Sequence, residues 1–414
     1  MDEACLAELL RRPALERLLG VLDGDGEETR VVGGAVRNAL LGRPVDEVDL
    51  ATTASPDVVS ERATRAGFKA VPTGIEHGTV TIVVDGTPFE VTTLREDVET
   101  HGRRATVRFG RDFAADARRR DFTINALSAT RDARLHDYVG GLADLAARRV
   151  RFIGDPWARI REDYLRILRF FRFSGEYADG PLDGEGLHAV IGERAGLAIL
   201  SRERVRAEVL KLLVSRRAVE IVTVLSDTGL LARFIAGVGD IGRLARIADH
   251  ERREGRRADA VLRLAALAVA TPEDAERLRE LLRLSNDDHE RLAAIAGLVA
   301  RLKSQPEPLD AIGVRRLVAD LGAGLLADAL AITAGEPRPV VADDARPALR
   351  RFLSGEEPPP VFPLRGADVL ARGVPAGPQV GEILARARAA WLAAGCPGQA
   401  SLDEALADVQ PSSR

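Results

Sequence analysis

The chain has 414 residues, of which 46% are hydrophobic and only 4% aromatic, and its formal net charge is −4. This length exceeds the size at which one hydrophobic core usually stops growing, so we expect two to four domains. The acidic balance argues against a generally basic, RNA-coating protein, although a basic stripe on an acidic body stays possible. Arginine is abundant and lysine nearly absent, so arginine runs alone are weak signals of nucleic-acid binding.

The sequence shows no sign of export or membrane insertion. Cys5 and Cys396 lie near opposite ends and match no metal-binding spacing, which favours a reducing compartment without disulfides. No basic segment followed by an apolar run opens the chain, so we expect no signal peptide. The longest apolar stretch, around Ala260 to Ala270, contains Arg263 and is too short to span a bilayer. We therefore expect a cytoplasmic protein without a membrane partner.

Strand and helix patterns alternate over the first 140 residues. A short helix ends in the turn Asp23–Gly26, and a helical pattern over Ala35–Leu41 follows the first strand. The predicted strands are Thr29–Val32, Val48–Ala51, Phe68–Val71, Thr79–Val84, Phe89–Thr93 and Leu135–Tyr138. This alternation predicts one domain that combines a sheet with helices.

From Leu142 onward the pattern changes to successive helices with apolar residues at a period of 3.6. Thr271-Pro272-Glu273-Asp274 predicts a helix start, with a capping residue, a first-turn proline and first-turn acids. Proline-rich breaks divide the later part into a helical body and a helical tail; they fall at Gln305–Pro308, Glu336–Pro339 and Glu356–Pro360. The predicted fold class is therefore α+β, with a mixed-sheet head followed by all-α domains.

A glycine pair marks the junction of the first strand with its helix. Gly33 and Gly34 leave room for a phosphate to approach backbone N–H groups at the positive end of the helix. Arg37, one turn later, offers a fork of donors that suits a phosphate group. We predict that these three residues contact a triphosphate.

Three acids follow on neighbouring predicted strands. Glu47 and Asp49 are two residues apart, so on a strand their carboxylates project from one face, and Glu90 lies on another strand. Carboxylates beside a phosphate site are ligands that Mg²⁺ prefers when it aligns a hydroxyl with a triphosphate. We predict that Glu47, Asp49 and Glu90 are catalytic metal ligands. Arg103, Arg104 and Arg108 form either a basic loop near this site or an ordinary solvated loop.

Two further blocks, Arg119–Leu127 and Glu162–Arg166, complete a recognisable set. Together with the glycine pair and the acids, they resemble the class II CCA-adding enzyme and bacterial poly(A) polymerase family. A weaker resemblance, to the RNA-binding tail of that family, covers Phe362–Asp368 and Gly381–Leu384. The resemblance implies a nucleotidyltransferase head or palm over residues 1–141, a neck over 142–220, a body over 221–335 and a tail over 336–414.

The resemblance assigns the block at residues 119–127 to recognition of the ribose. It implies that Asp121 accepts the 2′-hydroxyl proton, that Arg120 lies near the phosphates and that Asn125 supports the turn. Glu47 stands where the family usually has Asp, so either the strand accommodates the longer side chain or metal binding is weaker; we favour accommodation. Asn38 replaces an Asp that is common in the family, and we place it behind the site.

By the same resemblance, the block at residues 162–166 forms a helix that serves as a protein template for the incoming base. Three apart on such a helix, Asp163 and Arg166 would share a face. An Asp that accepts and an Arg that donates match the edges of cytosine and adenine, whereas guanine and uracil present the reverse order. Glu162, four residues before Arg166, would hold the guanidinium in place. An ordinary salt-bridged helix is the alternative.

The resemblance implies an enzyme that adds C, C and A to the 3′ end of tRNA from CTP and ATP with Mg²⁺. CC-only addition, A-only addition and poly(A) synthesis use the same blocks and stay open. A catalytically decayed RNA-binding protein is a further alternative, motivated only by Glu47. The sequence predicts nothing about oligomeric state.

Overall fold

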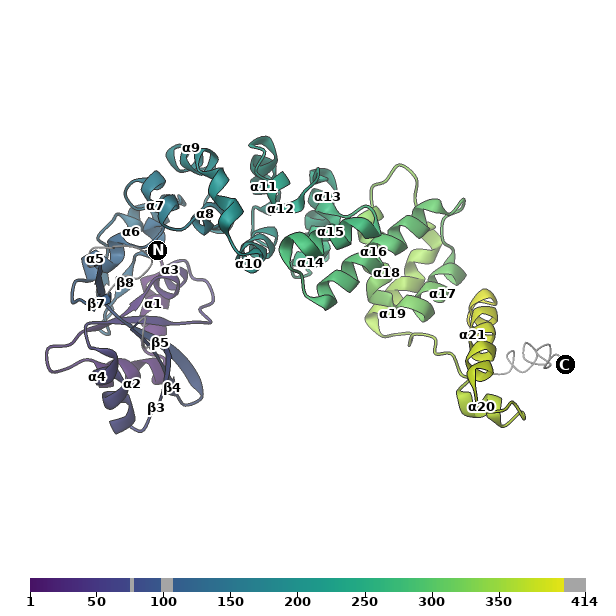
Figure 1. Ribbon diagram of the computed structural model, residues 1–414, viewed down its shortest axis with the longest axis horizontal. Helices are drawn as coiled ribbons and strands as arrows, with labels where there is room; N and C mark the ends of the chain where they lie inside the picture. The colour runs from purple at the N-terminus through teal and green to yellow at the C-terminus, as the bar shows by residue number, and fades with distance from the viewer. Residues whose placement is uncertain (75–77, 98–106, 398–414) are drawn as a thin grey trace. The chain divides into compact units, whose positions relative to one another are not determined.

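The computed structural model describes residues 1–74, 78–97 and 107–397, and it divides into two compact units. The first unit is Met1–Ser201 with Ser215–Arg217, and the second is Arg202–Val214 with the chain from Ala218 onward. In Figure 1 the first unit runs from purple to teal and the second from teal to yellow. The predicted α+β class is confirmed, while the finer division at residues 141, 220 and 335 stays a prediction. Arg103 and Arg104 lie outside the described residues.

A mixed sheet organises the first unit. Its strands pair in the order β3-β4-β5-β2-β1-β8-β9; β2 and β5 run parallel and the other pairs antiparallel, while β6 and β7 pair separately. The strands are β1 (Thr29–Val32), β2 (Asp49–Thr52), β3 (Lys69–Gly74), β4 (Thr79–Val84), β5 (Thr87–Thr93), β6 (Arg95–Asp97), β7 (Val107–Phe109), β8 (Ser128–Ala129) and β9 (Leu135–His136).

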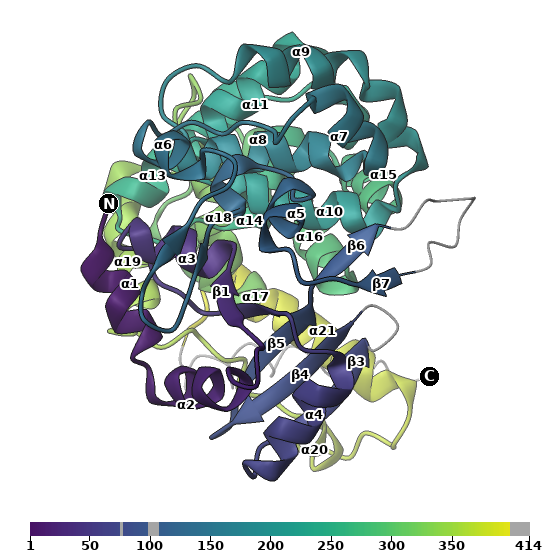
Figure 2. The same cartoon turned by 90° about the vertical axis from the view of Figure 1, so that its left-hand side faces the viewer.

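Helices cover this sheet and then continue the chain. The helices of the first unit are α1 (Glu3–Leu10), α2 (Pro13–Leu22), α3 (Gly34–Leu40), α4 (Pro56–Arg65), α5 (Phe113–Arg118), α6 (Gly141–Ala146), α7 (Pro156–Glu162), α8 (Leu165–Tyr177) and α9 (Gly184–Gly192), with 3-10 turns η2 (Thr123–Asn125) and η3 (Arg194–Ile199). Helix α4 lies against β3, β4 and β5, and α2 packs on α4 and β4 (Figure 2). Apolar side chains such as Leu18 and Ile82 are fully buried in this layer. Burying them anchors the sheet whose central strands carry the predicted acids.

The regular elements described in the second unit are all helices, and one isolated bridge pairs Leu309 with Val341. Its elements are α10 (Arg202–Leu213), α11 (Ala218–Asp227), α12 (Ala232–Ile235), α13 (Ile241–Arg253), α14 (Ala260–Ala268), α15 (Pro272–Leu282), α16 (Asn286–Ser304), α17 (Ala311–Leu321), α18 (Ala323–Thr333), η4 (Asp343–Ala345), α19 (Arg346–Ser354), α20 (Gly366–Leu370) and α21 (Pro378–Ala393). The predicted start of α15 is confirmed, because Asp274 accepts the Thr271 N–H at 3.0 Å. None of the helices in the described ranges combines the length and low charge that a membrane span requires.

Candidate active site

The glycine turn adopts a backbone that favours glycine. Gly33 has φ +69°, a left-handed conformation, and its N–H donates to the carbonyl oxygen of Leu127 at 2.9 Å. A Cβ atom placed on Gly33 would lie 2.9 Å from Nη1 of Arg120. The arginine of the predicted ribose block therefore crosses directly over the predicted phosphate turn, and a side chain at Gly33 would collide with it.

The predicted acids lie on the adjoining strands. Asp49 and Glu90 are direct partners in the parallel pairing of β2 with β5. Regular pairing begins at Asp49, so Glu47 precedes the strand, and our placement of both acids on one strand was wrong in this detail. The burial pattern nevertheless alternates across them, because Val48 and Leu50 are buried while Glu47 and Asp49 are exposed. Glu47 and Asp49 thus share the open side.

Electrostatic crowding makes this acidic edge suitable for a cation. Desolvation, then the charge of Glu90 and more weakly that of Glu47, raise the pKa of Asp49, and Arg120 opposes them. Oxygen ligands with mutual repulsion fit a hard divalent ion. No three His, Cys, Asp or Glu side chains within the described ranges already form a metal-holding cluster. One or two carboxylates with substrate phosphates are the usual Mg²⁺ environment, so the three-acid set stays a prediction.

Asp116 of α5 positions the arginines of the ribose block. Its Oδ2 accepts from Nε and Nη2 of Arg120 at 3.1 and 3.0 Å, and its Oδ1 accepts from Nε of Arg119 at 3.0 Å. Burial opposes ionisation of Asp116, but both arginines outweigh it and lower its pKa. Sequence reasoning missed this residue, although its spacing of three and four from Arg119 and Arg120, which directly follow α5, was a usable signal.

Asp121, the predicted ribose contact, is a buried and fully engaged carboxylate. Its Oδ1 accepts from the Phe122 N–H at 2.8 Å and from Nδ2 of Asn125 at 3.0 Å. Its Oδ2 accepts from Arg169 of α8, with Nε at 2.7 Å and Nη2 at 2.6 Å. Burial works against the charge, but Arg169 and these hydrogen bonds prevail and lower the pKa of Asp121. Asn125 supports this turn, and the ribose contact stays a prediction.

Arg37 points into the protein. It is buried, and its guanidinium donates to Oδ1 of Asn125, to Oδ1 of Asn38 and, at 2.7 Å, to the hydroxyl of Tyr177. Burial lowers the pKa of Arg37 to about 10. These contacts tie α3 to the ribose block and to α8, which the sequence did not predict. A phosphate contact by Arg37 stays a prediction.

The predicted template helix is interrupted. Helix α7 ends at Glu162, Asp163 is extended with φ −153° and ψ 107°, and α8 begins at Leu165. The single helix that we expected is therefore wrong, because the Asp163 carboxylate accepts the Leu165 N–H at 3.1 Å and starts a new helix. The predicted Glu162–Arg166 ion pair is confirmed. The Arg166 N–H also donates to the carbonyl oxygen of Asp163 at 3.0 Å, so the two stay adjacent.

Comparison with known proteins identifies the family. The model of the Poly A polymerase head domain matches residues 29–151, and that of the probable RNA and SrmB-binding site of polymerase A matches residues 187–238. The CCA-adding enzyme of Geobacillus thermodenitrificans is 34% identical, over 90% of this chain and 91% of that enzyme. The chain belongs to the CCA-adding enzyme family. Nucleotidyltransferases of this family generally use divalent metal ions.

Other members of the CCA-adding enzyme family match over shorter spans or by fold. The mitochondrial CCA tRNA nucleotidyltransferase 1 of Danio rerio is 44% identical over 49% of this chain, which spans about half the length of that relative. The Bacillus stearothermophilus CCA-adding enzyme in complex with CTP has a TM-score of 0.67 and 28% identity, covering 92% of this chain and 94% of that one. The Thermotoga maritima CCA-adding enzyme complexed with tRNA, at 19% identity, shares the fold, with a TM-score of 0.69 over 99% of both chains.

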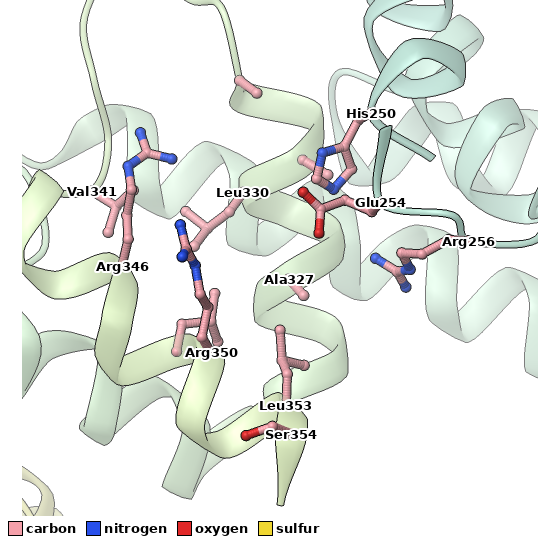
Figure 3. A pocket seen from close by; sticks show the side chains of 13 residues that line it. His250, Glu254, Arg256, Ala327, Leu330, Val341, Arg346, Arg350, Leu353 and Ser354 are labelled. Carbon is pink, nitrogen blue, oxygen red and sulfur yellow. The ribbon is translucent and has the colours of Figure 1, made fainter. Parts of the chain in front are cut away.

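A separate hollow of about 720 Å³ lies in the second unit, between α13, α18 and α19 (Figure 3). Arg346 and Arg350 project from α19 on one side, and Arg256 lies across from them. Leu330 and Ala327 of α18 form an apolar wall between. The hollow therefore combines an apolar wall with three arginines, His250 and the carboxylate of Glu254. Because the guanidinium groups outnumber the single carboxylate, the hollow suits a polyanion better than a small apolar ligand.

Proposed function

We propose that this chain adds C, C and A to the 3′ end of tRNA, using CTP and ATP and releasing pyrophosphate, without a nucleic-acid template. Family membership supports the reaction class. The observation that carries the proposal for this chain is the direct pairing of Asp49 with Glu90, beside a glycine turn that Arg120 crosses. A cytoplasmic location agrees with the bacterial relatives.

The acidic edge would hold Mg²⁺ through Asp49 and Glu90, with Glu47 as a further ligand. Such an ion, when bound, increases the acidity of the primer hydroxyl and offsets charge on the phosphates. Gly33 and Gly34 leave room for the triphosphate, and Arg120 and Arg37 supply positive charge close to it. Asp121 selects the ribose through its 2′-hydroxyl.

The base is selected at the junction of α7 and α8. Arg166 donates to the acceptor nitrogen of cytosine or adenine and Asp163 accepts from the exocyclic amine, so guanine and uracil meet mismatched groups. Glu162 and the carbonyl oxygen of Arg159, at 2.9 Å, hold the Arg166 guanidinium. The reaction depends mainly on positioning and electrostatics, as in other phosphoryl transfers.

A product-length assay tests the proposal. A tRNA transcript that ends at the discriminator base is incubated with Mg²⁺ and with CTP, ATP or both, and the products are sized at single-nucleotide resolution. Three added residues that require both nucleotides support CCA addition. Two residues with CTP alone and no further growth with ATP would indicate a CC-adding enzyme, a single A on a CC-ended primer an A-adding enzyme, and a long A tract a poly(A) polymerase.

The arginine-rimmed hollow of the second unit is our candidate for a tRNA backbone contact. Arg350→Glu should raise the KM for tRNA several-fold and reduce its dependence on salt, while the KM for CTP stays unchanged, because phosphate contacts act through charge. Arg301→Glu, at an exposed position of α16 outside the lining of the hollow, is the matched charge reversal. Equal effects of both substitutions would show that only net charge matters.

A further inference from the structure

One face of α8 contacts the predicted ribose block at several points. Arg166, Arg169, Phe173 and Tyr177 follow one another at spacings of three and four residues, and we call this set the α8 face. We propose that Arg169 is a positioning residue: by binding Asp121 from the α8 face, it makes selection of the base and selection of the ribose depend on one salt bridge. This inference rests on the proposed function and assigns a role that the sequence motifs leave open.

The salt bridge is built to fix orientation. Nε and Nη2 of Arg169 both approach the single oxygen Oδ2 of Asp121, at 2.7 and 2.6 Å, so turning the guanidinium away from Asp121 lengthens at least one of the two contacts. The Asp121 side chain is 10% exposed and that of Arg169 31%. Limited access to water makes the pair stronger than a surface ion pair.

The α8 face continues the connection to the far end of the helix. The Arg169 guanidinium lies 5.1 Å from the centre of the Phe173 ring, which stacks on Tyr177 at 5.7 Å. The Arg37 guanidinium lies 3.9 Å from the Tyr177 ring and also donates to Asn125, whose Nδ2 donates to Asp121. The contacts therefore form a closed ring that begins and ends at Asp121.

The same helix carries Arg166, the residue that we propose contacts the base. Arg166 is three residues before Arg169, which is about 4.5 Å of helix rise, and its Nη2 reaches the carbonyl oxygen of Arg119 at 3.5 Å. If the Asp121–Arg169 salt bridge is lost, α8 can shift, and Arg166 shifts with it. A misplacement of about 1 Å by a substitution outside the reacting groups can cost about 100-fold in rate. Loss of Asp121 should therefore impair base choice as well as ribose choice.

The test measures both selectivities in one set of variants. Single-nucleotide addition to tRNA that ends at the discriminator base gives kcat/KM for CTP, UTP and dCTP, hence one CTP/UTP ratio and one CTP/dCTP ratio. Arg169→Ala and Asp121→Asn should each lower both ratios by about 10- to 100-fold. The double variant should lose no more than the worse single variant, because both changes remove one interaction.

The controls separate this inference from the proposed function. Arg161→Ala removes an exposed salt bridge between α7 and Glu193 and should leave both ratios unchanged. A wild-type chain that fails to incorporate CMP would refute the proposed function. If the wild type is active, three outcomes would refute only the coupling of base selection to ribose selection. Those outcomes are a fall in the CTP/dCTP ratio alone in Asp121→Asn, unchanged ratios in Arg169→Ala, or additive losses in the double variant.

A charge-preserving variant covers the case in which Arg169→Ala fails to fold. Arg169→Lys keeps the cation but lacks the two donors that fix orientation, so both ratios should fall to values between wild type and Asp121→Asn. Thermal unfolding followed by circular dichroism establishes that each variant is folded. Arg169→Lys with wild-type ratios would contradict an orienting role.

Discussion

Two carboxylate sites in the first unit differ in how completely the protein itself satisfies them. Glu47, Asp49 and Glu90 are exposed, and within the described residues no hydrogen bond or ion pair engages their carboxylates. Asp121 is buried, and four donor groups approach its two oxygens. The pKa of Asp49 is raised, whereas that of Asp121 is lowered.

The difference indicates that the two carboxylate sites have different roles, one in binding ligands and the other in positioning neighbouring residues. An acidic edge that repels itself gains most from a positive ligand, so its favourable interactions are reserved for the bound metal and triphosphate. A carboxylate such as Asp121, whose oxygens already accept hydrogen bonds from the protein, holds the neighbouring groups in place before a ligand binds. The following experiments are designed to break one site without the other.

Removal of Asp49 should have the largest effect on activity. Asp49→Ala is expected to reduce Mg²⁺-dependent CMP incorporation by at least about 1,000-fold, because a metal site supplies several kcal/mol of transition-state stabilisation. Thermal stability should stay the same or rise slightly, since the substitution relieves repulsion. Asp46→Ala, at the neighbouring exposed acid, should retain activity, and Glu47→Asp should retain or increase it if Glu47 is a ligand. Activity that is indifferent to Asp49→Ala would favour an RNA-binding protein without catalysis.

Gly33→Ala should impair the turn between the two sites. The left-handed backbone and the contact with Arg120 are both unfavourable for a side chain, so we expect a loss of about 1–3 kcal/mol in the free energy of unfolding and a higher KM for CTP. Gly67 provides the matched control, because it has φ +80° and no atom within 4 Å of an added Cβ. Gly67→Ala should show the backbone strain alone, and an equal KM effect would refute a role of the turn in nucleotide binding.

The sequence predicted the strands around Glu47, Asp49 and Glu90 better than the side-chain contacts of Asp121. The bounds of β1 and β4 and the α+β class are confirmed, because strand alternation and the glycine pair are local signals. The short strands β6 to β8 have two or three residues, too few for a pattern. Arg169 was missed because arginine is common throughout this chain, and because its salt-bridge partner, Asp121, is 48 residues away in the sequence. The helix break at Asp163 was missed because residues 162–166 contain no glycine or proline. The break arises from the Asp163 side chain, which accepts the Leu165 N–H.

Acidification should separate the two sites. The raised pKa of Asp49 means that its carboxylate takes up a proton at a higher pH than an ordinary Asp, so kcat/KM should fall early as the pH drops. Because protons compete with the metal, a tenfold higher Mg²⁺ concentration should shift this fall to lower pH. In a pH profile measured at two Mg²⁺ concentrations, coincident curves would argue against Asp49 as a metal ligand.

Protein stability should follow the opposite pattern over the same pH range. Protonation of Asp49 stabilises the folded state slightly, because its pKa is higher there than in the unfolded chain. The Asp121 carboxylate, whose pKa is lowered, contributes stability above the pKa of an unfolded Asp and loses it only as the pH falls through the folded value. The midpoint temperature of thermal unfolding should therefore stay unchanged over the pH range in which kcat/KM has already fallen.

Tyr177→Phe should produce the smallest effect and probe the ring at its weakest contact. The ring stacking on Phe173 and Arg37 is kept, but Arg37 loses the hydroxyl acceptor at 2.7 Å, which should cost about 1–2 kcal/mol in the free energy of unfolding. Tyr138→Phe removes a comparable acceptor from Arg30, at 3.0 Å, outside the α8 face. We expect both variants to lose similar stability, and only Tyr177→Phe to lower the CTP/UTP ratio, by about two- to fivefold. This range corresponds to less than about 1 kcal/mol. That result would show that the ring of contacts through Asp121 positions Arg166. Equal ratios in both variants would restrict Tyr177 to a role in folding.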